Sequence, residues 1–444
     1  MKDINDIKIL VFTVDCWSKN VGANTMSSLF SWCKPENLAN VYIRPEIPTY
    51  EGCGAYFQIR ENDVIRSIIN RNVTTGRTVY PNQAVSDDAI QAQKKQYNKF
   101  REHRPWLLLY AREILWKMGM WKSIGLKDFI LNFKPDVIVY AYEGLIHFNR
   151  IVRYAVELTG ASAIGYFWDD NFTYKQFPGN IGYYIYRYFQ RKDIKKSVAL
   201  SSANFAITPK TKKECDDFFG IDSIVLTKPI PKVDNQYVIK QKHNPIKLLY
   251  TGNLGIGRSG TLKIISQAIS ELNSDGKCFE LDVYTGTYIS SEEKIKMGDD
   301  VNFHNAVTQD EVIKLQKDAD VLLFIEDIRS KNSKIARLSF STKLTDYFAA
   351  GKCILAVASD DIAPIEYLRD NDAALVACNY EDIVSALCKM AENSDIIDQY
   401  AVKAYKLGQQ NHNYDTVVST LKNTISTIMP NQNHESNPQV MAVP

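Results

Sequence analysis

The amino-acid sequence predicts an α/β protein built from two Rossmann-like, doubly wound domains that face a cleft. Its 444 residues suit two such domains of about 200 residues each. Short apolar runs alternate with longer helical segments, and a polar, proline-containing stretch divides these runs into two series. Because the runs are apolar on both faces, we expect them to be buried parallel strands covered by helices.

The first series predicts an N-terminal domain over residues 1–230. A region from about residue 50 to 133 interrupts the series and is expected to be an insertion that is helical over 101–132. Within this insertion, the polar residues 74–96 predict a loop-rich segment. The strands expected in this domain are Lys8–Val14, Asp136–Tyr140, Ala161–Trp168, Asn204–Thr208 and Ser223–Leu226.

The second series predicts a C-terminal domain over residues 231–405. It follows Thr227–Asn244, whose two prolines and many polar residues are typical of a linker. Residues 406–429 predict a C-terminal helix, and the polar tail 430–444 is expected to be disordered. The strands expected in this domain are Ile246–Thr251, Phe279–Tyr284, Val301–His304, Asp320–Ile325, Cys353–Val357 and Ala374–Ala377.

Composition narrows the function classes. The net charge is only +2, which argues against a nucleic-acid-binding protein. The eight cysteines form no CxxC pair, so we expect neither a zinc site nor a redox dithiol, and we interpret them as reduced thiols. The N-terminus lacks a signal-peptide pattern and no apolar window approaches membrane-spanning length. These features predict a cytoplasmic protein.

A glycine-rich loop, Thr251–Gly260 (TGNLGIGRSG), lies between an expected strand and a helix. Glycines let the backbone approach a ligand, the amides of the helix N-terminus bind phosphate, and Arg258 adds a fixed positive charge. The portion Gly255–Gly260 also fits GxGxxG, and Asp282 follows about 20 residues later, as in dinucleotide-binding enzymes. The loop therefore allows a phosphate site, an NAD-dependent oxidoreductase, or a tight turn without a ligand.

The segment Leu338–Ala356 predicts a polar loop, a short helix and a strand. Ser341, Thr342 and Lys343 fall at the start of the helix, where hydroxyls and amides hold anions. Asp346 lies three residues after Lys343, so both side chains can face one cleft, where a carboxylate can accept the hydroxyls of a ribose. An N-capped helix with an i,i+3 ion pair is the alternative interpretation.

Three segments resemble the retaining GT-B glycosyltransferases of family 4, and most closely the bacterial capsular and exopolysaccharide enzymes. SFSTKLTDYFAAGKCILAV matches their S-x-K-x-x-[ED]-Y-x-A-x-G-[KR]-x-I-L element, and YTGNLGIGRSG-x-L matches their donor phosphate loop. WKSIGLKDFILNFKPDVIVY matches the helix and strand before their N-domain cleft. The resemblance extends over about residues 5–425. It implies metal-independent transfer, without a cofactor, from a UDP- or GDP-sugar to a glycan or lipid-linked acceptor in surface polysaccharide synthesis.

The resemblance also implies roles for individual residues. Arg258 and Lys343 would contact the donor diphosphate, and Asp346 would bind the ribose. Many members carry two glutamates eight positions apart; here the second is Asp346 and the first falls on Leu338. Glu326 is a candidate donor-sugar contact in its place, or a solvated loop charge, and the departure also allows a non-catalytic nucleotide- or glycan-binding relic. The other donor-site candidates are Gly252, Asn253, Gly257, His304, Asn305, Ser341 and Thr342.

His304 and Asn305 end a segment similar to the family's nucleobase-contacting strand and turn, although a lone histidine there is often structural. On the acceptor side, the loop after the first strand resembles a glycine-containing family loop, with a plain turn as the alternative. Polar groups that follow two later expected strands are predicted to lie at the cleft. Of Asp169 and Asp170, one is expected to orient the acceptor hydroxyl and the other to cap a helix. Glu143 and His147, which follow the strand before them, are further candidates for the cleft. The acceptor-side candidates are Asn20, Gly22, Asn24, Asp169 and Asp170.

Two stretches carry an apolar or aromatic face beside basic residues. Trp106–Trp121 has a helical stripe, which we expect to pack in the core. Tyr183–Lys196 interleaves aromatic and basic residues, which allows core packing or contact with an anionic membrane. The stripe residues are Leu107, Ala111, Ile114, Met118 and Trp121.

Overall fold

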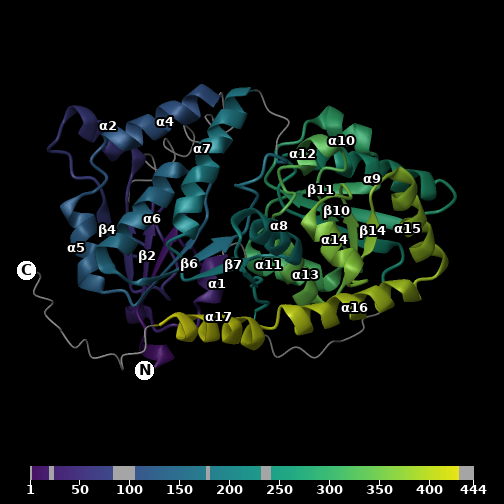
Figure 1. The fold of residues 1–444 in the computed structure, drawn as a ribbon. Helices are drawn as coiled ribbons and strands as arrows, with labels where there is room; N and C mark the ends of the chain where they lie inside the picture. Colours follow the sequence, from purple (N-terminus) through teal and green to yellow (C-terminus); the bar gives the residue numbers. More distant parts are fainter. Residues whose placement is uncertain (1–2, 20–24, 84–105, 177–180, 232–241, 430–444) are drawn as a thin grey trace, which may run out of the picture.

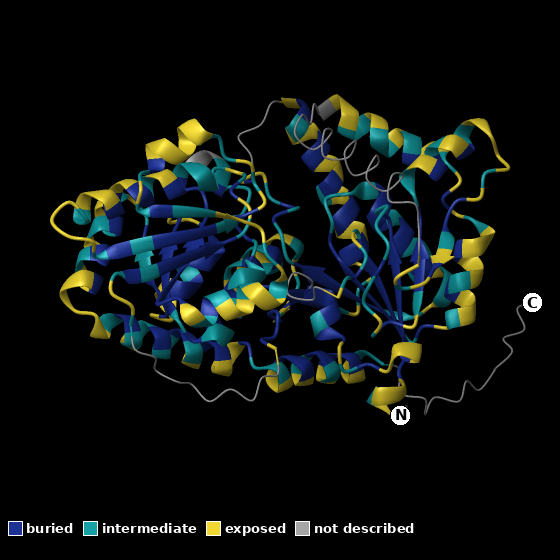
Figure 2. Ribbon diagram, turned by 180° about the vertical axis from the view of Figure 1, so that it is seen from behind, coloured by how far each residue is buried: buried dark blue, intermediate teal, exposed yellow. Residues whose placement is uncertain are grey.

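The computed structural model describes residues 3–19, 25–83, 106–176, 181–231 and 242–429. It contains two domains, each with one parallel or mostly parallel sheet between layers of helices (Figure 1). Buried residues fill the sheets and the inner faces of the helices, and exposed residues lie on the outer helix faces (Figure 2). The predicted α/β class with two doubly wound domains is therefore confirmed.

The N-terminal sheet has the order β4-β3-β2-β1-β5-β6-β7-β8, and only the β3–β4 pair is antiparallel. β1 is central, with Ile9 opposite Leu38 on one side and Val137 on the other. The strands are β1 (Ile9–Thr13), β2 (Leu38–Tyr42), β3 (Ala55–Gln58), β4 (Arg77–Val79), β5 (Val137–Ala141), β6 (Ser162–Phe167), β7 (Ala203–Ala206) and β8 (Ile224–Val225).

Three strands of this sheet were not predicted. β3 and β4 lie within the expected insertion, and β4 lies in its expected loop, so residues 50–83 build part of the sheet instead of interrupting it. β2 and β3 were missed because Asn40 and Gln58 break their apolar pattern although both are fully buried. Asn40 Nδ2 donates to the Val11 carbonyl at 3.0 Å, and Gln58 Nε2 donates to the Arg44 carbonyl at 2.7 Å.

The helices of this domain cover both faces of the sheet (Figure 1). The expected core position of the Trp106–Trp121 stripe is wrong, because Leu107, Ala111, Ile114 and Met118 are exposed and only Trp121 is buried. The helices are α1 (Thr25–Leu29), α2 (Glu61–Ile69), α4 (Trp106–Met118), α5 (Ile124–Phe133), α6 (Ile146–Thr159), α7 (Ile181–Val198) and α8 (Pro209–Phe219).

The C-terminal sheet is parallel throughout, in the order β11-β10-β9-β12-β13-β14. Its strands are β9 (Ile246–Thr251), β10 (Phe279–Thr285), β11 (Val301–Asn305), β12 (Val321–Ile325), β13 (Cys353–Val357) and β14 (Leu375–Ala377). Its helices are α9 (Arg258–Leu272), α10 (Ser291–Met297), α11 (Gln309–Asp318), α12 (Ser330–Ser333), α13 (Thr342–Ala350), α14 (Ala363–Asp370) and α15 (Tyr380–Glu392). The strand order reverses between β9 and β12, and parallel sheets bind ligands at such a point.

The end of the described chain crosses back to the N-terminal domain. In place of one helix over 406–429, the structure has α16 (Asp395–Asn411) and α17 (Tyr414–Ile428), separated where Asn413 caps α17. α16 lies along the C-terminal domain and α17 along the N-terminal one (Figure 1). The tail 430–444 lies outside the described residues.

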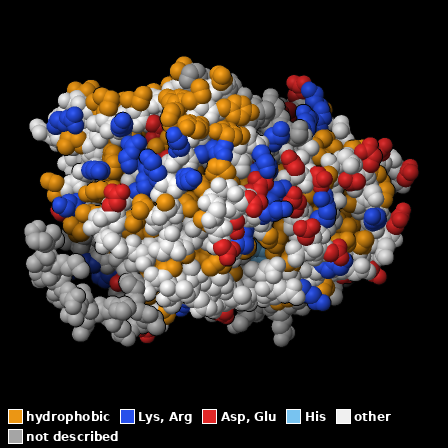
Figure 3. All heavy atoms as spheres, viewed as in Figure 1, with side chains coloured by type: hydrophobic (Ala, Val, Ile, Leu, Met, Phe, Trp, Pro, Cys, Tyr) orange, Lys and Arg blue, Asp and Glu red, His pale blue; other side chains and the backbone are white. Residues whose placement is uncertain are grey.

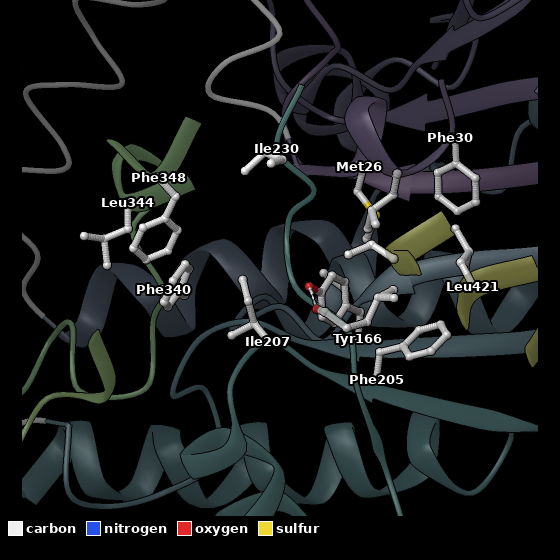
Figure 4. Close-up of a cluster of buried hydrophobic side chains, with 14 of the residues drawn as sticks. Met26, Phe30, Tyr166, Phe205, Ile207, Ile230, Phe340, Leu344, Phe348 and Leu421 are labelled. Carbon is white, nitrogen blue, oxygen red and sulfur yellow. Dashed lines mark hydrogen bonds between the residues drawn. The ribbon is translucent and has the colours of Figure 1, made fainter. Parts of the chain in front are cut away.

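The two domains are joined through a shared core. The chain leaving β8 runs beside the α16–α17 junction, where the Ile230 amide donates to the His412 carbonyl at 2.8 Å. Buried side chains from both domains and both crossing segments belong to one cluster (Figure 4). In the part of the chain that the structure describes, no helix is long and apolar enough to cross a membrane.

Candidate active site

A cleft of about 550 Å³ lies between the two domains. Loops that follow β1, β5 and β6 line its N-terminal side, and the glycine loop, the end of β12 and the start of α13 line its C-terminal side. The carboxyl ends of both sheets therefore meet at one cavity, as expected for ligand-binding parallel sheets. Its polar lining residues are Thr13, Asp15, Thr25, Glu143, Asp169, Gln176, Arg258, Glu326, Ser339, Ser341 and Thr342.

The glycine loop brings its backbone against a lysine. Gly252 adopts a φ of +142°, and a Cβ there would collide with Lys343 Nζ. Lys343 Nζ lies 4.5 Å from the centroid of the Tyr250 ring and 3.3 Å from its hydroxyl. Gly257, at φ +84°, is the N-cap of α9, and a Cβ there would collide with Asp327. Glycine at position 252 thus lets the turn pass close to the Lys343 ammonium group.

Arg258 and Glu326 form a bidentate ion pair at the cleft. Arg258 Nε and Nη2 donate to the two Glu326 carboxylate oxygens at 2.9 and 2.8 Å. Glu326 is only 7% exposed, so the interpretation as a solvated loop charge is wrong. Its carboxylate fixes the guanidinium in the cleft lining, and both side chains remain available to a ligand there.

The N-terminus of α13 adds a third positive element. Ser341 is its N-cap and lines the cleft, but its side chain accepts no hydrogen bond from the amides of the first turn. Such a helix end favours an anion through its unpaired amides and its dipole. Burial, with a smaller contribution from the Arg258 guanidinium, lowers the pKa of Lys343 to about 8. The helix N-terminus, Lys343 and Arg258 together form a positively charged cluster, the candidate anion site, whose charge suits a multiply charged anion.

Asp346 is paired with a lysine from the interdomain segment. Lys228 Nζ lies 3.5 Å from Asp346 Oδ1, and Lys228 is only 3% exposed. Burial raises the pKa of Asp346 and lowers the pKa of Lys228. The carboxylate thus lies beside the anion site with Lys228 as its ion-pair partner, in place of the i,i+3 pair with Lys343 that the sequence allowed.

The N-terminal side of the cleft is acidic. Burial, followed by repulsion from Asp169 and Asp15, raises the pKa of Glu143 to about 8. Burial also raises the pKa of Asp169 to about 6, although Asp169 accepts a hydrogen bond from the Ser339 hydroxyl. Near neutral pH, Glu143 is therefore mainly protonated and can donate a hydrogen bond, whereas Asp169 is mainly ionised and accepts one.

Other candidates lie elsewhere. Asp170 is fully buried and accepts hydrogen bonds from the Thr173 amide and from Arg337, so it caps a turn instead of lining the cleft. His147 is buried, stacked on Trp116 with ring centroids 4.3 Å apart, and its Nδ1 lies 2.9 Å from Glu113. It is therefore a core residue and not a cleft residue. Asn20, Gly22 and Asn24 lie outside the described residues.

The proposed nucleobase contacts lie beyond this cavity. His304 and Asn305 are exposed at the end of β11, and the His304 ring stacks on Tyr284 with centroids 4.3 Å apart. His304 Nε2 lies 2.9 Å from Asp282, and Lys247 Nζ lies 3.7 Å from the same carboxylate. Asp282, which the dinucleotide alternative needs for a ribose, is thus engaged by two neighbours on the sheet.

Comparisons with known proteins address the fold. No protein-family model and no curated sequence matches this chain. HepE of Anabaena in complex with UDP is similar in structure, with a TM-score of 0.57 and 9% identity over 95% of this chain and 100% of that one. The α,α-trehalose 6-phosphate synthase of Burkholderia multivorans has a TM-score of 0.57 and 10% identity over 95% and 97%. This chain has the GT-B fold.

TarM shares the GT-B fold with a TM-score of 0.50 and 10% identity. The match covers 68% of this chain and 57% of TarM, so this chain spans little more than half the length of TarM.

Several residues at or behind this GT-B cleft carry no signal in the sequence. Lys228, which pairs with Asp346, belongs to a polar linker-like stretch, and Tyr250, which contacts Lys343, has the pattern of a buried strand residue. Ser339 and Gln176 line the cleft from loops whose partners lie in the other domain. Within the described ranges, no three His, Cys, Asp or Glu side chains are grouped so as to hold a metal ion; the expected independence from metal stays a prediction.

Proposed function

We propose that this protein is a glycosyltransferase that moves a sugar from UDP to a hydroxyl of a glycan or lipid-linked acceptor. The observation that carries the proposal is that Arg258 and the α13 N-terminus line one side of an interdomain cleft, with Lys343 of the same helix turn against Tyr250 and close enough to Arg258 for mutual repulsion. Similar structures support the choice of nucleotide, because HepE was determined with UDP and with UDP-glucose. Asp346, beside the anion site, is the proposed ribose ligand.

In the proposed reaction, the bond between the sugar C1 and the diphosphate oxygen breaks, and a bond from C1 to the acceptor oxygen forms. The acceptor proton passes to a phosphate oxygen of the departing UDP. Negative charge grows on the diphosphate in the transition state, so Arg258, Lys343 and the α13 amides stabilise that state more than the bound donor. Glu143 and Asp169, across the cleft, would orient the acceptor hydroxyl.

The finer parts of the proposal rest on the sequence resemblance. We propose retention of the anomeric configuration, independence from metal, and a cytoplasmic role in bacterial surface polysaccharide synthesis. The positive groups of the anion site would take the role that a divalent cation has in other sugar transferases. Asp282, engaged by His304 and Lys247, disfavours the NAD-dependent alternative.

The test combines binding and turnover. We expect UDP to raise the melting temperature and NAD to leave it unchanged, since a ligand stabilises by mass action. Turnover of UDP-sugars with glycan and lipid-linked acceptors should be unaffected by EDTA, and proton NMR of the product should show the anomeric configuration of the donor. Stabilisation by NAD alone would refute the proposal. UDP binding without transfer to any acceptor would indicate a relic.

The pKa of Lys343 predicts how UDP binding depends on pH. The charged lysine is present below about pH 8 and is lost above it. Because the bound diphosphate needs the charged form, the association constant should fall by up to about tenfold per pH unit above that value. Calorimetry between about pH 7 and 9 measures the slope. A Lys343→Arg variant, whose charge persists in this range, should show no such inflection; an equal slope in both proteins would contradict the assignment.

A further inference from the structure

Helix α7 places a run of large apolar side chains outward. Its buried face mixes the apolar Tyr186, Ile194 and Val198 with the polar and charged Arg187, Gln190 and Asp193. Its exposed face begins with a run of large apolar side chains: Ile181, Tyr184, Ile185, Tyr188 and Phe189 are 37 to 79% exposed. A helix that lies on a protein core shows the opposite arrangement. The outer face of α7 is therefore suited to contact an apolar environment outside the protein.

Helix α4 lies beside α7 and extends this surface. The Tyr110 ring of α4 contacts Tyr186 and Phe189 of α7, with ring centroids 5.4 and 6.5 Å apart. Leu107, Ile114 and Met118 of α4 are 55 to 60% exposed. The two helices form one edge of the N-terminal domain, and Figure 3 shows hydrophobic side chains gathered along it. A continuous exposed apolar surface of this kind marks an interaction site.

The charge around this surface is positive. Lys192, Lys195 and Lys196 lie on the exposed face of α7 after its apolar run. Arg191 lies against the Tyr174 and Phe218 rings, 4.2 Å from each centroid. The only acid of α7, Asp193, is buried and paired with Arg153. Lys and Arg side chains lie directly below the hydrophobic edge in Figure 3.

The surface is connected to the cleft by a short loop. Tyr174 closes a shallow groove of about 470 Å³ on α7, lined also by Ile181, Tyr184, Ile185 and Tyr188. Asp169 and Gln176, which lie five residues before and two residues after Tyr174 in the same loop, line the cleft. Arg187 of α7 holds this loop by donating to the Asp170 carbonyl, at 3.1 Å, and to the Gln176 side chain. A molecule on the groove is thus one loop away from the acceptor side of the cleft.

We propose that the exposed faces of α4 and α7 dock this protein on an anionic phospholipid membrane, with the cleft beside the bilayer surface. Aromatic and aliphatic side chains would enter the headgroup–acyl boundary while the lysines bind anionic headgroups. Docking of this kind favours an acceptor sugar carried on a lipid; this last step rests on the proposed transferase function, whereas the docking does not.

Vesicle co-sedimentation tests the docking. We expect binding to vesicles of phosphatidylcholine with phosphatidylglycerol, weakened by salt, and little binding to phosphatidylcholine alone. Each basic residue near such a surface strengthens binding by about fivefold, so Lys192→Gln, Lys195→Gln and Lys196→Gln together should weaken it more than tenfold. Ile181→Ser with Ile185→Ser should weaken binding to a similar degree by removing apolar insertion.

Matched variants on the C-terminal domain serve as controls. The apolar control combines Ile295→Ser with Ile313→Ser, and the basic control combines Lys314→Gln, Lys389→Gln and Lys406→Gln. Both change exposed side chains of the same types and should leave vesicle binding unchanged. The proposal is overturned if the wild type stays in the supernatant, if the control variants lose binding equally, or if sedimentation shows a dimer that Ile181→Ser with Ile185→Ser dissociates. Stabilisation by UDP is measured without vesicles, so failure of docking and failure of the transferase assignment are distinguishable.

Discussion

Replacing Lys343 by alanine is expected to abolish stabilisation by UDP and to lower the turnover number by about 10²- to 10³-fold. The ammonium group lies against Gly252 and the Tyr250 ring, and Arg258, which lines the cleft with the α13 N-terminus, is close enough to repel it. Removing one fixed donor from a site where charge develops typically costs a rate factor of this size. Thermal shift with UDP and steady-state kinetics with the UDP-sugar measure the two effects.

The control is Lys314→Ala, which removes an exposed lysine from α11. It should leave both UDP binding and turnover unchanged. The Lys343→Arg variant keeps the charge but changes the geometry, and should retain part of the UDP stabilisation. Unchanged turnover in Lys343→Ala would place the diphosphate elsewhere and remove the basis of the proposed function.

Replacing Arg337 by alanine is expected to lower the free energy of unfolding by about 3 to 5 kcal/mol, as measured by denaturant titration. Arg337, on the loop before α13, is 5% exposed and donates to Asp170 at 2.8 Å and to Glu214 of α8. The substitution leaves the fully buried Asp170 without its counter-ion, and removing one partner of a buried pair is strongly destabilising. The same contacts join the C-terminal domain to the loop that carries Asp169.

The matched control is Arg369→Ala. Arg369 and Asp360 form an ion pair whose side chains are 46 and 69% exposed, and exposed pairs contribute no more than about 1 kcal/mol. A loss of stability no larger in Arg337→Ala than in Arg369→Ala would show that the Asp170 network is not needed for the fold.

Strands were predictable wherever their side chains were apolar. β9 and β13 begin and end at the predicted residues. β13 is an uninterrupted apolar run, and β9 contains only Lys247 and Thr251 besides apolar and aromatic residues. β2 and β3 were not predictable, because Asn40 and Gln58 are polar in sequence and find their hydrogen-bond partners, backbone carbonyls and the Thr13 and Arg77 side chains, on other segments of the chain. The local sequence pattern identifies a strand when its buried side chains are all apolar. It fails when a hydrogen bond to another part of the fold allows a polar side chain in the core.

The anion site was predictable for a similar reason. Glycines, a helix start and basic residues occur within two short segments, so Arg258 and Lys343 could be named before the structure. The pairs Lys228–Asp346 and Asp170–Arg337 span 118 and 167 positions. The sequence near one residue of such an ion pair does not indicate the other residue. Only the structure therefore shows that Asp170 is held by Arg337 and Asp346 by Lys228.

The sequence alone determined the two-domain α/β architecture and the two segments that make up the candidate anion site, because both depend on local periodicity and helix ends. Only the tertiary structure decided which apolar helix faces are buried. The α4 stripe has the spacing of a core face, yet Leu107, Ile114 and Met118 lie in solvent. Periodicity shows that a helix has an apolar side; what packs against that side depends on the positions of the neighbouring elements.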